Sequence, residues 1–289
     1  AEDVARGVFV IRSLKRGEPI PVDVVQSLFP DRQNDFVLSV GESDVVLIHQ
    51  MSESATAKDM EKVAQCDVAF TALPHGASKD VIPSLIEKGL KVIDLSGDFR
   101  YDDIKVYEKW YGGEHSSPEL LKESVYGLCE LYRDKVKDAR LVGNPGCYTT
   151  CSILGAYPVL ASGLGESKNI IVDAKSGVTG AGRGLSLGTH FCECTENTKA
   201  YKVATHRHTS EIEQELSKAA GEEIMISFTP HLIPQKRGIL STIYVNLTKP
   251  CTTEELVNTY KEFYKNEYFV RVKDAGKLPE TKHVAGSNF

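Results

Sequence analysis

The chain has 289 residues, 41% of them hydrophobic and 26% charged, which is the composition of an ordinary globular protein long enough for two domains. Its formal net charge of −6, without a run rich in lysine and arginine, argues against a nucleic-acid partner. No apolar run reaches the roughly 20 residues that a membrane span needs, and no secretory signal opens the chain, so a membrane protein is not expected. The odd number of cysteines, 7, favours reduced thiols and a cytoplasmic enzyme, with an organelle stroma or matrix as the alternative.

The first half of the sequence alternates between apolar runs typical of buried strands and longer segments typical of helices. We expect strands over 44–50, 67–73 and 91–95, separated by helices over 55–65 and 77–88. This spacing predicts right-handed βαβ units and a parallel sheet, whose ligands bind at the carboxyl ends of the strands. The loops Pro74-His75-Gly76 and Ser96–Arg100 each follow a strand, and we therefore expect them on the ligand-binding edge.

The second half has fewer helices between its strands. Strands are expected over 169–174, 224–229 and 238–247, the last being the longest, and a helix over 252–264 with Thr253 as its N-cap. The sequence therefore predicts an α/β protein in which a parallel-sheet domain precedes an α+β domain with a broad mixed sheet. We place the boundary near Gly146, between domains over 1–146 and 147–289.

Cys147 follows the turn-forming Asn144-Pro145-Gly146 and precedes a small, apolar run typical of a helix. If Cys147 begins that helix, its thiol lies at the positive end of the helix dipole, where unpaired backbone N–H groups favour an anion. This is one of the environments that lower the pKa of a cysteine and make its thiolate a nucleophile. A buried cysteine that packs at a helix start is the structural alternative.

The other cysteines form no metal-binding or redox pattern. Cys192 and Cys194 are separated by one residue rather than two, and Cys151, four residues after Cys147, has no matching second pair of ligands. We therefore expect structural thiols at these positions and no metal site.

Eight stretches carry a resemblance that runs in order from about residue 66 to the end of the chain. They are 72–76 (ALPHG), 94–100 (DLSGDFR), 125–128 (VYGL) with 130–133 (ELYR), 143–148 (GNPGCY), 176–183 (SGVTGAGR), 206–212 (HRHTSEI), 228–232 (FTPHL) with 237–238 (RG), and 285–289 (AGSNF). Together they resemble the N-acetyl-γ-glutamyl-phosphate reductase family, the arginine-biosynthesis relatives of aspartate-semialdehyde dehydrogenase.

The resemblance implies an enzyme that uses NADPH to reduce a small acyl phosphate to an aldehyde with release of phosphate. Residues 1–146 would be a Rossmann-like, NADP-binding domain, and 147–289 would carry catalysis, substrate binding and assembly into a homodimer or homotetramer. Exchange of phosphate for a thioester needs an activated cysteine, which makes Cys147 the nucleophile, and a nicotinamide then supplies hydride. The alternatives are reduction of another acyl phosphate, aspartyl or aminoadipyl, and a non-catalytic subunit of the same fold.

A histidine is the expected base, because its usual pKa suits proton transfer near neutrality. His206 and His208 are two residues apart, so their side chains would face the same side of an extended segment. The resemblance favours His208 as the partner of the Cys147 thiolate. Glu211, three residues later, could orient His208 if a helix begins near Thr209.

The phosphate and carboxylate groups of such a substrate need cationic side chains, and arginine offers parallel N–H donors. By resemblance, Arg100 is the first choice for the substrate phosphate. Further candidates for substrate contacts are Arg207, Arg237, Arg183, His206 and Asn144.

The segment 176–182 holds three glycines in seven residues, which could let its backbone approach the nicotinamide half of a cofactor. A flexible loop between strands is the structural alternative. The resemblance implies cofactor contacts in this loop and near the end of the chain. With the two edge loops, the expected cofactor contacts are Pro74, His75, Gly76, Ser96, Ser176, Gly177, Gly180 and Asn288.

The resemblance fails at both ends of the sequence. In the family, the first strand leads into a glycine-rich loop that holds the cofactor pyrophosphate, whereas here the strand-like Val8–Arg12 is followed by a segment with one glycine, Gly17. Residues 1–43 match nothing assignable, and the chain stops at Phe289, where the family continues. We favour a portion of a longer protein over a rearranged cofactor site or a member that has lost cofactor binding.

Overall fold

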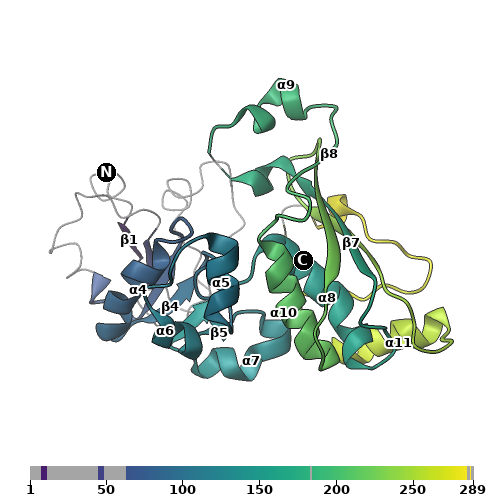
Figure 1. The fold of residues 1–289 in the computed structure, drawn as a ribbon, viewed down its shortest axis with the longest axis horizontal. Helices are drawn as coiled ribbons and strands as arrows, with labels where there is room; N and C mark the ends of the chain where they lie inside the picture. Colours follow the sequence, from purple (N-terminus) through teal and green to yellow (C-terminus); the bar gives the residue numbers. More distant parts are fainter. Residues whose placement is uncertain (1–7, 12–44, 49–62, 183, 285–286, 288–289) are drawn as a thin grey trace. The chain divides into compact units, whose positions relative to one another are not determined.

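Figure 1 shows the computed structural model of the chain, which describes residues 8–11, 45–48, 63–182, 184–284 and 287. The chain divides into two compact units, residues 1–145 and 146–289. Most of the helix expected over 55–65 lies outside the described residues, as do two candidate site residues, Arg183 and Asn288.

The first unit is built on one six-stranded sheet. Its strands run parallel except β1, which is antiparallel to β2. The parallel pairing of β3 with β4 sets Thr71 opposite Asp94, so the loops that follow these two strands leave the same edge of the sheet, as the sequence predicted. In the order β1-β2-β3-β4-β6-β5, the strands are β1 (Val8–Ile11), β2 (Val45–Ile48), β3 (Val68–Thr71), β4 (Lys91–Asp94), β6 (Leu141–Gly143) and β5 (Val125–Tyr126).

Helices of the first unit pack their apolar side chains on this sheet. Leu85 and Leu121 share one buried core with Val92 of β4 and Leu141 of β6, and burial of each large apolar side chain contributes about 1.5–3 kcal/mol. This core holds β3 and β4 in place, and with them the loops at their carboxyl ends. The helices are α4 (Ser78–Glu87), α5 (Ile104–Tyr111), α6 (Pro118–Glu123) and α7 (Cys129–Asp138).

The second unit contains a four-stranded mixed sheet. β7 runs parallel to β9, whereas β10 is antiparallel to β7 and β8 is antiparallel to β9. The expectation that the strand near 238–247 is the longest was wrong, because β10 spans 6 residues and β7 and β9 span 8 each. After Tyr244 the chain leaves β7, and Leu247 instead bridges Gly165. In the order of the sheet, the strands are β10 (Ile239–Tyr244), β7 (Ile170–Gly177), β9 (Ile226–Ile233) and β8 (Lys199–Ala200).

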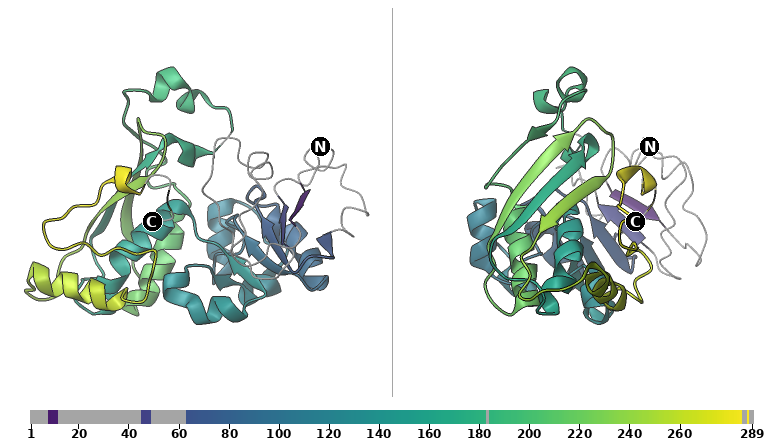
Figure 2. Two further views of the ribbon diagram at one scale, coloured as in Figure 1. Left: turned by 180° about the vertical axis from the view of Figure 1, so that it is seen from behind. Right: turned by 90° about the vertical axis from the view of Figure 1, so that its right-hand side faces the viewer.

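Two helices, α8 (Cys147–Ala161) and α10 (His208–Ala220), form a layer on one face of this sheet (Figure 2). Alternate residues of β7 point into the core between the layers, and Val172 and Ala174 are fully buried there. Ile212 and Leu216 of α10 contribute to the same core. The packing therefore fixes α8 and α10 relative to one another, and both helices begin at a candidate catalytic residue.

A third helix, α11 (Thr253–Phe263), docks on α8 through two tyrosine hydroxyls. Tyr260 donates to the carbonyl of Gly155 at 2.6 Å, and Tyr264 donates to the carbonyl of Leu154 at 2.7 Å. The N-cap of α11 is Thr252 rather than the expected Thr253. The shift has a clear cause, since only Thr252 lies three residues before Glu255 and completes a capping box with it.

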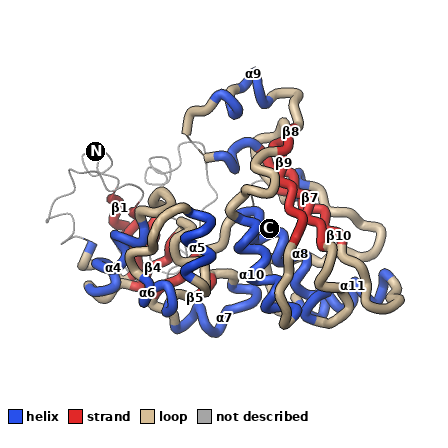
Figure 3. Tube along the Cα trace, viewed as in Figure 1, coloured by secondary structure: helices blue, strands red, loops and turns tan. Residues whose placement is uncertain are grey.

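The described connecting segments of the second unit contain short helical turns, of which α9 is labelled in Figure 3. They are η1 (Val178–Ala181), η2 (Leu187–Thr189), α9 (Phe191–Cys194) and η3 (Thr281–His283). Among the described residues, no helix has both the length and the apolar character that crossing a bilayer requires. The same residues contain no cluster of three or more histidine, cysteine or acidic side chains arranged to bind a metal ion.

Candidate active site

The first residue of α8 is Cys147, as the sequence predicted, and its side chain is exposed. Gly146 is the N-cap, with extended φ and ψ of −74° and 166°, and it has no side chain that could cap the helix. The hydroxyls of Thr149 and Thr150 both donate back to the Gly146 carbonyl, at 2.6 and 2.9 Å, and fix the first turn. The sulfur of Cys147 therefore lies at the end of α8 where the helix dipole favours negative charge.

The first residue of α10 is His208, and its ring packs directly on the backbone of Gly146. A Cβ added to Gly146 would lie 2.3 Å from Nε2 and 2.5 Å from Cε1 of His208. Only glycine fits at this position with the ring in place. The imidazole thus occupies the space beside the residue that precedes Cys147, which is where a base for the thiol is needed.

Glu211 joins α10 to the turn before α8. Its carboxylate is fully buried and accepts the N–H of Gly146 at 3.2 Å. The helix begins at His208, one residue earlier than the expectation for Glu211 assumed. The described contact gives Glu211 a positioning function, because it holds the first turn of α10 against the turn that leads to Cys147.

The segment that carries His206 is a turn rather than the extended segment that we expected. Lys202 and Ala204 adopt left-handed backbone angles, with φ of 46° and 57°. The two histidine rings nevertheless meet, with centroids 4.7 Å apart, and Nδ1 of His206 accepts the backbone N–H of His208 at 3.1 Å. Burial lowers the pKa of His206 to about 3, with a smaller contribution in the same direction from His208.

Two tyrosines that sequence reasoning missed lie beside this cluster. Tyr201 donates its hydroxyl to that of Tyr148 at 3.1 Å, and Tyr148 donates to the carbonyl of His231 at 3.0 Å. Burial raises the pKa of both phenols above its usual value, so both hydroxyls stay neutral. Tyr148 could have been noticed as the neighbour of Cys147, whereas nothing in the sequence distinguishes Tyr201.

The arginine candidates differ in exposure. Arg100, in the first unit, is 5% exposed and donates one guanidinium N–H to the carbonyl of Leu95 at 2.9 Å, so part of its donor capacity holds its own loop. Arg207 and Arg237, in the second unit, are exposed. Asn144 is half-buried, and its amide donates to the carbonyl of Pro145 at 3.4 Å. Arg207 and Arg237 are therefore the solvent-exposed arginine candidates, whereas Arg100 is buried.

Two buried carboxylates organise the loops at the carboxyl ends of β3 and β4. Asp94 accepts the hydroxyls of Thr71 and Ser78, each at 2.8 Å, and that of Ser96 at 2.6 Å. Burial raises the pKa of Asp94, against the opposing effect of these hydroxyl donors. The hydroxyl of Ser96 is thereby directed into the protein.

Asp98 performs a similar function at the beginning of α4. Its carboxylate accepts the N–H of Gly76 at 2.8 and 3.0 Å and the N–H of Lys79 at 3.2 Å. The hydroxyl of Tyr107 donates to it as well, at 3.2 Å. Pro74 and His75 remain exposed on this edge, and Nδ1 of His75 accepts the N–H of Gly97 at 2.9 Å.

Gly177, at the end of β7, and Gly180, in η1, both lie close to other parts of the protein. A Cβ on Gly177 would lie 2.7 Å from the backbone nitrogen of Arg237, and a Cβ on Gly180 would lie 2.7 Å from the hydroxyl of Ser176. The close approach that the structure shows is between Gly177 and the segment 236–237, and the expected approach of this loop to a cofactor stays a prediction. Ser176 itself is buried and donates to the Gly177 carbonyl at 3.0 Å.

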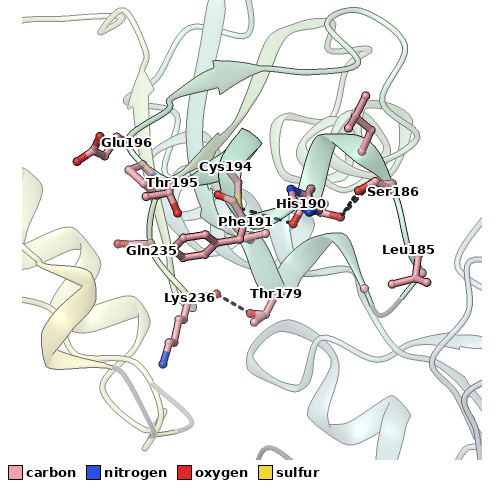
Figure 4. A pocket seen from close by; sticks show the side chains of 16 residues that line it. Thr179, Leu185, Ser186, His190, Phe191, Cys194, Thr195, Glu196, Gln235 and Lys236 are labelled. Atoms are coloured by element: carbon pink, nitrogen blue, oxygen red, sulfur yellow. Dashed lines mark hydrogen bonds between the residues drawn. The ribbon is translucent and has the colours of Figure 1, made fainter.

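A cavity of about 1090 Å³ opens in the second unit, between residues 178–182 and 184–196 on one side and 234–236 on the other (Figure 4). The hydroxyl of Thr179 donates to the carbonyl of Lys236 at 2.7 Å and joins the two sides. The ring of Phe191 extends beside Gln235 and Lys236 in this view. Neither Cys147 nor His208 lines this cavity.

Comparison with known proteins matches both halves of the chain to models of protein families. Residues 27–139 match the semialdehyde dehydrogenase NAD binding domain, and residues 147–289 match the semialdehyde dehydrogenase dimerisation domain. The N-acetyl-gamma-glutamyl-phosphate reductase of Acetivibrio thermocellus is 55% identical over 92% of this chain and 72% of its own length.

The chain belongs to the N-acetyl-gamma-glutamyl-phosphate reductase family. Two further members of the family show how far the similarity extends. The protein of Symbiobacterium thermophilum is 55% identical over 79% of this chain and 66% of its own length, and that of Thermoanaerobacter pseudethanolicus is 46% identical over 98% of this chain and 80% of its own length. The chain thus spans between about two thirds and four fifths of these family members.

Solved structures share the fold at low sequence identity. Aspartate semialdehyde dehydrogenase II from Vibrio cholerae superimposes with a TM-score of 0.57 at 14% identity, covering 90% of this chain and 78% of that one. A probable aspartate-semialdehyde dehydrogenase from Pseudomonas aeruginosa gives 0.51 at 16% identity, covering 78% of this chain and 66% of that one. The family thus has the two-domain architecture of a Rossmann-like parallel sheet followed by a mixed sheet.

The first unit fits a nicotinamide dinucleotide in its topology and at its open edge. Dinucleotides bind outside the carboxyl ends of parallel strands, and here the loops after β3 and β4 leave that edge together. A Cβ on Gly76 would meet no atom of the described residues within 4 Å, so none of them covers this position. The Gly76 N–H and the Ser96 hydroxyl are engaged by Asp98 and Asp94, and they shape the edge rather than point outward.

Proposed function

We propose that this chain catalyses the NADPH-dependent reduction of N-acetyl-γ-glutamyl phosphate to N-acetylglutamate 5-semialdehyde, a step of arginine biosynthesis. Family membership supports the substrate class. The observation that carries the proposal is the packing of the His208 ring on Gly146, beside an exposed Cys147 at the start of α8. This arrangement brings the proposed base, at the start of α10, to the turn that precedes the proposed nucleophile at the start of α8.

The proposed reaction begins with the transfer of the Cys147 thiol proton to His208. The sulfur then attacks the acyl carbon, the bond from that carbon to the phosphate oxygen breaks, and inorganic phosphate leaves. The product of this half-reaction is a thioester on Cys147. NADPH, when bound, supplies the hydride that reduces the thioester carbonyl.

Release of the aldehyde returns the sulfur of Cys147 as a thiolate. The N-terminus of α8 favours that negative charge, and His208 can return the proton it took. Glu211 holds Gly146 and the first turn of α10 together while these charges change. Arg207 and Arg237 are the proposed contacts of the substrate's anionic groups, with Arg100 as a further contact of the phosphate.

We propose that both domains contribute residues that contact the cofactor. Pro74 and His75 of the first domain are exposed at the carboxyl edge of the sheet and would contact the dinucleotide, with Gly76 and Ser96 shaping that edge. The loop Ser176–Gly180 of the second domain would approach its nicotinamide half. Residues 1–146 would accordingly bind cofactor, and 147–289 would bind substrate and carry the nucleophile.

We also propose a cytoplasmic enzyme that assembles as a homodimer or homotetramer. The sheet of the second unit supports self-association, because Ile171 and Tyr244, which pair across β7 and β10, are exposed at 44% and 56%. Large exposed apolar side chains gathered on one face are typical of an interface. Light scattering coupled to gel filtration measures the state directly, and a monomer at micromolar concentration would contradict the proposal.

The deciding experiment measures the reverse reaction, reduction of NADP⁺ with N-acetylglutamate semialdehyde and phosphate. The wild-type chain is compared with Cys147→Ser and with Cys192→Ser, a matched control at the other exposed thiol. We expect a loss of at least about a thousandfold in kcat for Cys147→Ser and none for Cys192→Ser. Equal activity of the two variants would refute the thiol mechanism, and a folded wild-type chain without activity would refute the proposed function.

A further inference from the structure

His206 makes a contact that the reaction proposed above does not use. Its Nδ1 accepts the backbone N–H of His208 at 3.1 Å, the first amide of α10. The N-cap of that helix, Arg207, provides no side-chain cap of its own. The imidazole of His206 therefore satisfies one of the backbone amides that have no partner within a helix at its beginning.

The ring of His206 is itself held on several sides by aromatic edges. Its centroid lies 5.6 Å from Tyr148, 5.6 Å from Tyr201 and 5.5 Å from Phe228, with interplanar angles of 89°, 73° and 88°. The ring of His208 lies nearest, at 4.7 Å. We call these four rings, of Tyr148, Tyr201, Phe228 and His208, the aromatic box around His206. Because Tyr148 is the residue after Cys147, the box connects the first turn of α8 to the turn that precedes α10.

The hydrogen bond determines the state of the His206 ring. Because Nδ1 accepts an N–H, it carries no proton, and the proton of the neutral ring is on Nε2. Burial lowers the pKa of His206, and His208, Lys202 and Arg207 act in the same direction. Glu211 opposes them, and the facing phenols of Tyr148 and Tyr201 stay neutral because burial raises the pKa of each.

We propose that His206 is a positioning residue for the base: by capping α10 and filling the aromatic box, it holds the His208 ring against Gly146 and beside Cys147. This inference rests on the roles of Cys147 and His208 in the proposed function. It replaces the substrate contact expected of His206. Fraying of the first turn of α10 would move His208, since that residue begins the helix, and a small displacement of a base costs much of its effect.

A neutral His206 also suits the charge that appears during the reaction. When the thiol proton moves to His208, an imidazolium forms 4.7 Å from the His206 ring. A second positive charge there would oppose the transfer, as like charges a few ångströms apart do. The unprotonated ring caps the helix without adding that charge.

Two substitutions test the aromatic ring of His206 and its hydrogen-bond acceptor independently. His206→Phe keeps an aromatic side chain and removes Nδ1, whereas His206→Asn keeps an acceptor of the kind favoured at helix starts and removes the ring. His283→Ala, at an exposed histidine of η3, is the matched control. All three are compared with the wild-type chain for folding, by circular dichroism and thermal melting.

The decisive readout is the rate at which iodoacetamide alkylates Cys147 as a function of pH, without substrate or cofactor. We expect His206→Phe to slow alkylation at neutral pH roughly tenfold and to move the midpoint of the profile upward, and His206→Asn to recover within about threefold of wild type. Steady-state kinetics should show the loss in kcat, with KM changed less than about threefold. Imidazole ¹⁵N shifts should show an unprotonated Nδ1 at His206 that does not titrate between pH 8 and 5.

Three results would overturn the inference. One is a wild-type alkylation profile in His206→Phe with a raised KM, which would make His206 a substrate contact. Another is a lower melting temperature with an unchanged profile, which would make the residue purely structural. The third is equal loss in both His206 variants, which would remove the role of the acceptor. Because alkylation needs neither substrate nor cofactor, a shifted profile in a chain without reductase activity would refute the proposed function and keep this inference.

Discussion

Helices α4 and α8 both follow a parallel strand, and in both a buried carboxylate from a distant part of the chain reaches the beginning of the helix. At α4, Asp98 accepts the N–H of Gly76 and also that of Lys79, within the first turn. At α8, Glu211 accepts the N–H of Gly146, one residue before the helix, and the next side chain is the exposed Cys147. The first turn of α4 thus receives the carboxylate of Asp98, whereas the first residue of α8 is Cys147.

The comparison shows that a helix N-terminus is not in itself an anion site. Its partial positive charge is the same in both helices, but the partner differs. In the first unit, the buried carboxylates Asp94 and Asp98 are fully used in holding the edge loops. In the second unit, the same kind of contact holds the beginning of α10, where the proposed base His208 lies, against the turn before the proposed nucleophile Cys147. Substitutions should therefore affect stability in the first region and chemistry in the second.

The largest effect is expected from His208→Ala in the second region. Loss of a general base lowers kcat by about a thousandfold, within the usual range of 10²–10⁴, while the half-exposed ring contributes little to folding. The measurement is kcat at saturating substrate together with the melting temperature, with His283→Ala as control. If kcat falls only in proportion to the loss of folded protein, the expectation that substitutions in the second unit affect chemistry rather than stability is wrong.

The next effect concerns stability in the first region. Asp94→Ala removes the acceptor of three buried hydroxyls, those of Thr71, Ser78 and Ser96, and should lower the free energy of unfolding by about 3 kcal/mol. Asp94→Asn keeps an acceptor and should cost less. Urea unfolding measures both variants beside Asp134→Ala, an exposed carboxylate on α7. A cost for Asp94→Ala no larger than that of the exposed control would show that this network does not hold the edge.

Gly146→Ala should impair chemistry with little effect on folding. The backbone angles of Gly146 suit alanine, so the only conflict is that the new Cβ would lie 2.3 Å from Nε2 of His208. Displacement of the ring should lower kcat about 10- to 100-fold, with a stability change under about 1 kcal/mol. Gly113→Ala is the control, because a Cβ there meets nothing within 4 Å and its φ is not left-handed. Unchanged kcat in Gly146→Ala would mean that the position of the ring does not matter.

The smallest effect on stability is expected at α11, whose N-terminus is capped locally by Thr252 and Glu255. Thr252→Ala removes the side chain that accepts the Glu255 N–H at 3.2 Å and should lower stability by about 1 kcal/mol, without a change in kcat. Thr253→Ala, one residue later, lacks this bond and serves as control. Calorimetry that finds the larger cost at Thr253 would place the N-cap where the sequence first suggested.

Much of the fold could be predicted because it depends on local patterns. Alternating strands and helices located β2, β3, α4 and β4, and the turn before Cys147 located the beginning of α8. The N-cap of α11 was one residue off because Thr252 and Thr253 are both acceptable caps, and only the position of Glu255 separates them. Local sequence patterns thus predicted which helices and strands form, but not the exact residues at which they begin and end.

The candidate site was harder to predict because its contacts connect residues far apart in the sequence. Glu211 binds the N–H of a residue 65 positions earlier, and Asp98 binds that of one 22 positions earlier. The turn that carries His206 depends on left-handed angles at Lys202 and Ala204, residue types that do not favour them. The sequence, through the family resemblance, therefore predicts Cys147 and His208 as a pair, but it did not predict the aromatic box around His206.

One feature of α8 concerns recovery from oxidation. Cys151, on the same helix as Cys147, is buried deeply enough that the pKa of its thiol is raised to about 12, and it therefore stays protonated. A disulfide forms when a thiolate attacks an oxidised sulfur, so Cys151 is a poor partner for an oxidised Cys147 despite its place in the next turn. If peroxide converts the proposed nucleophile Cys147 to a sulfenic acid, the raised pKa of Cys151 disfavours its attack on that sulfur. Return to the working state would depend on small thiols from solution.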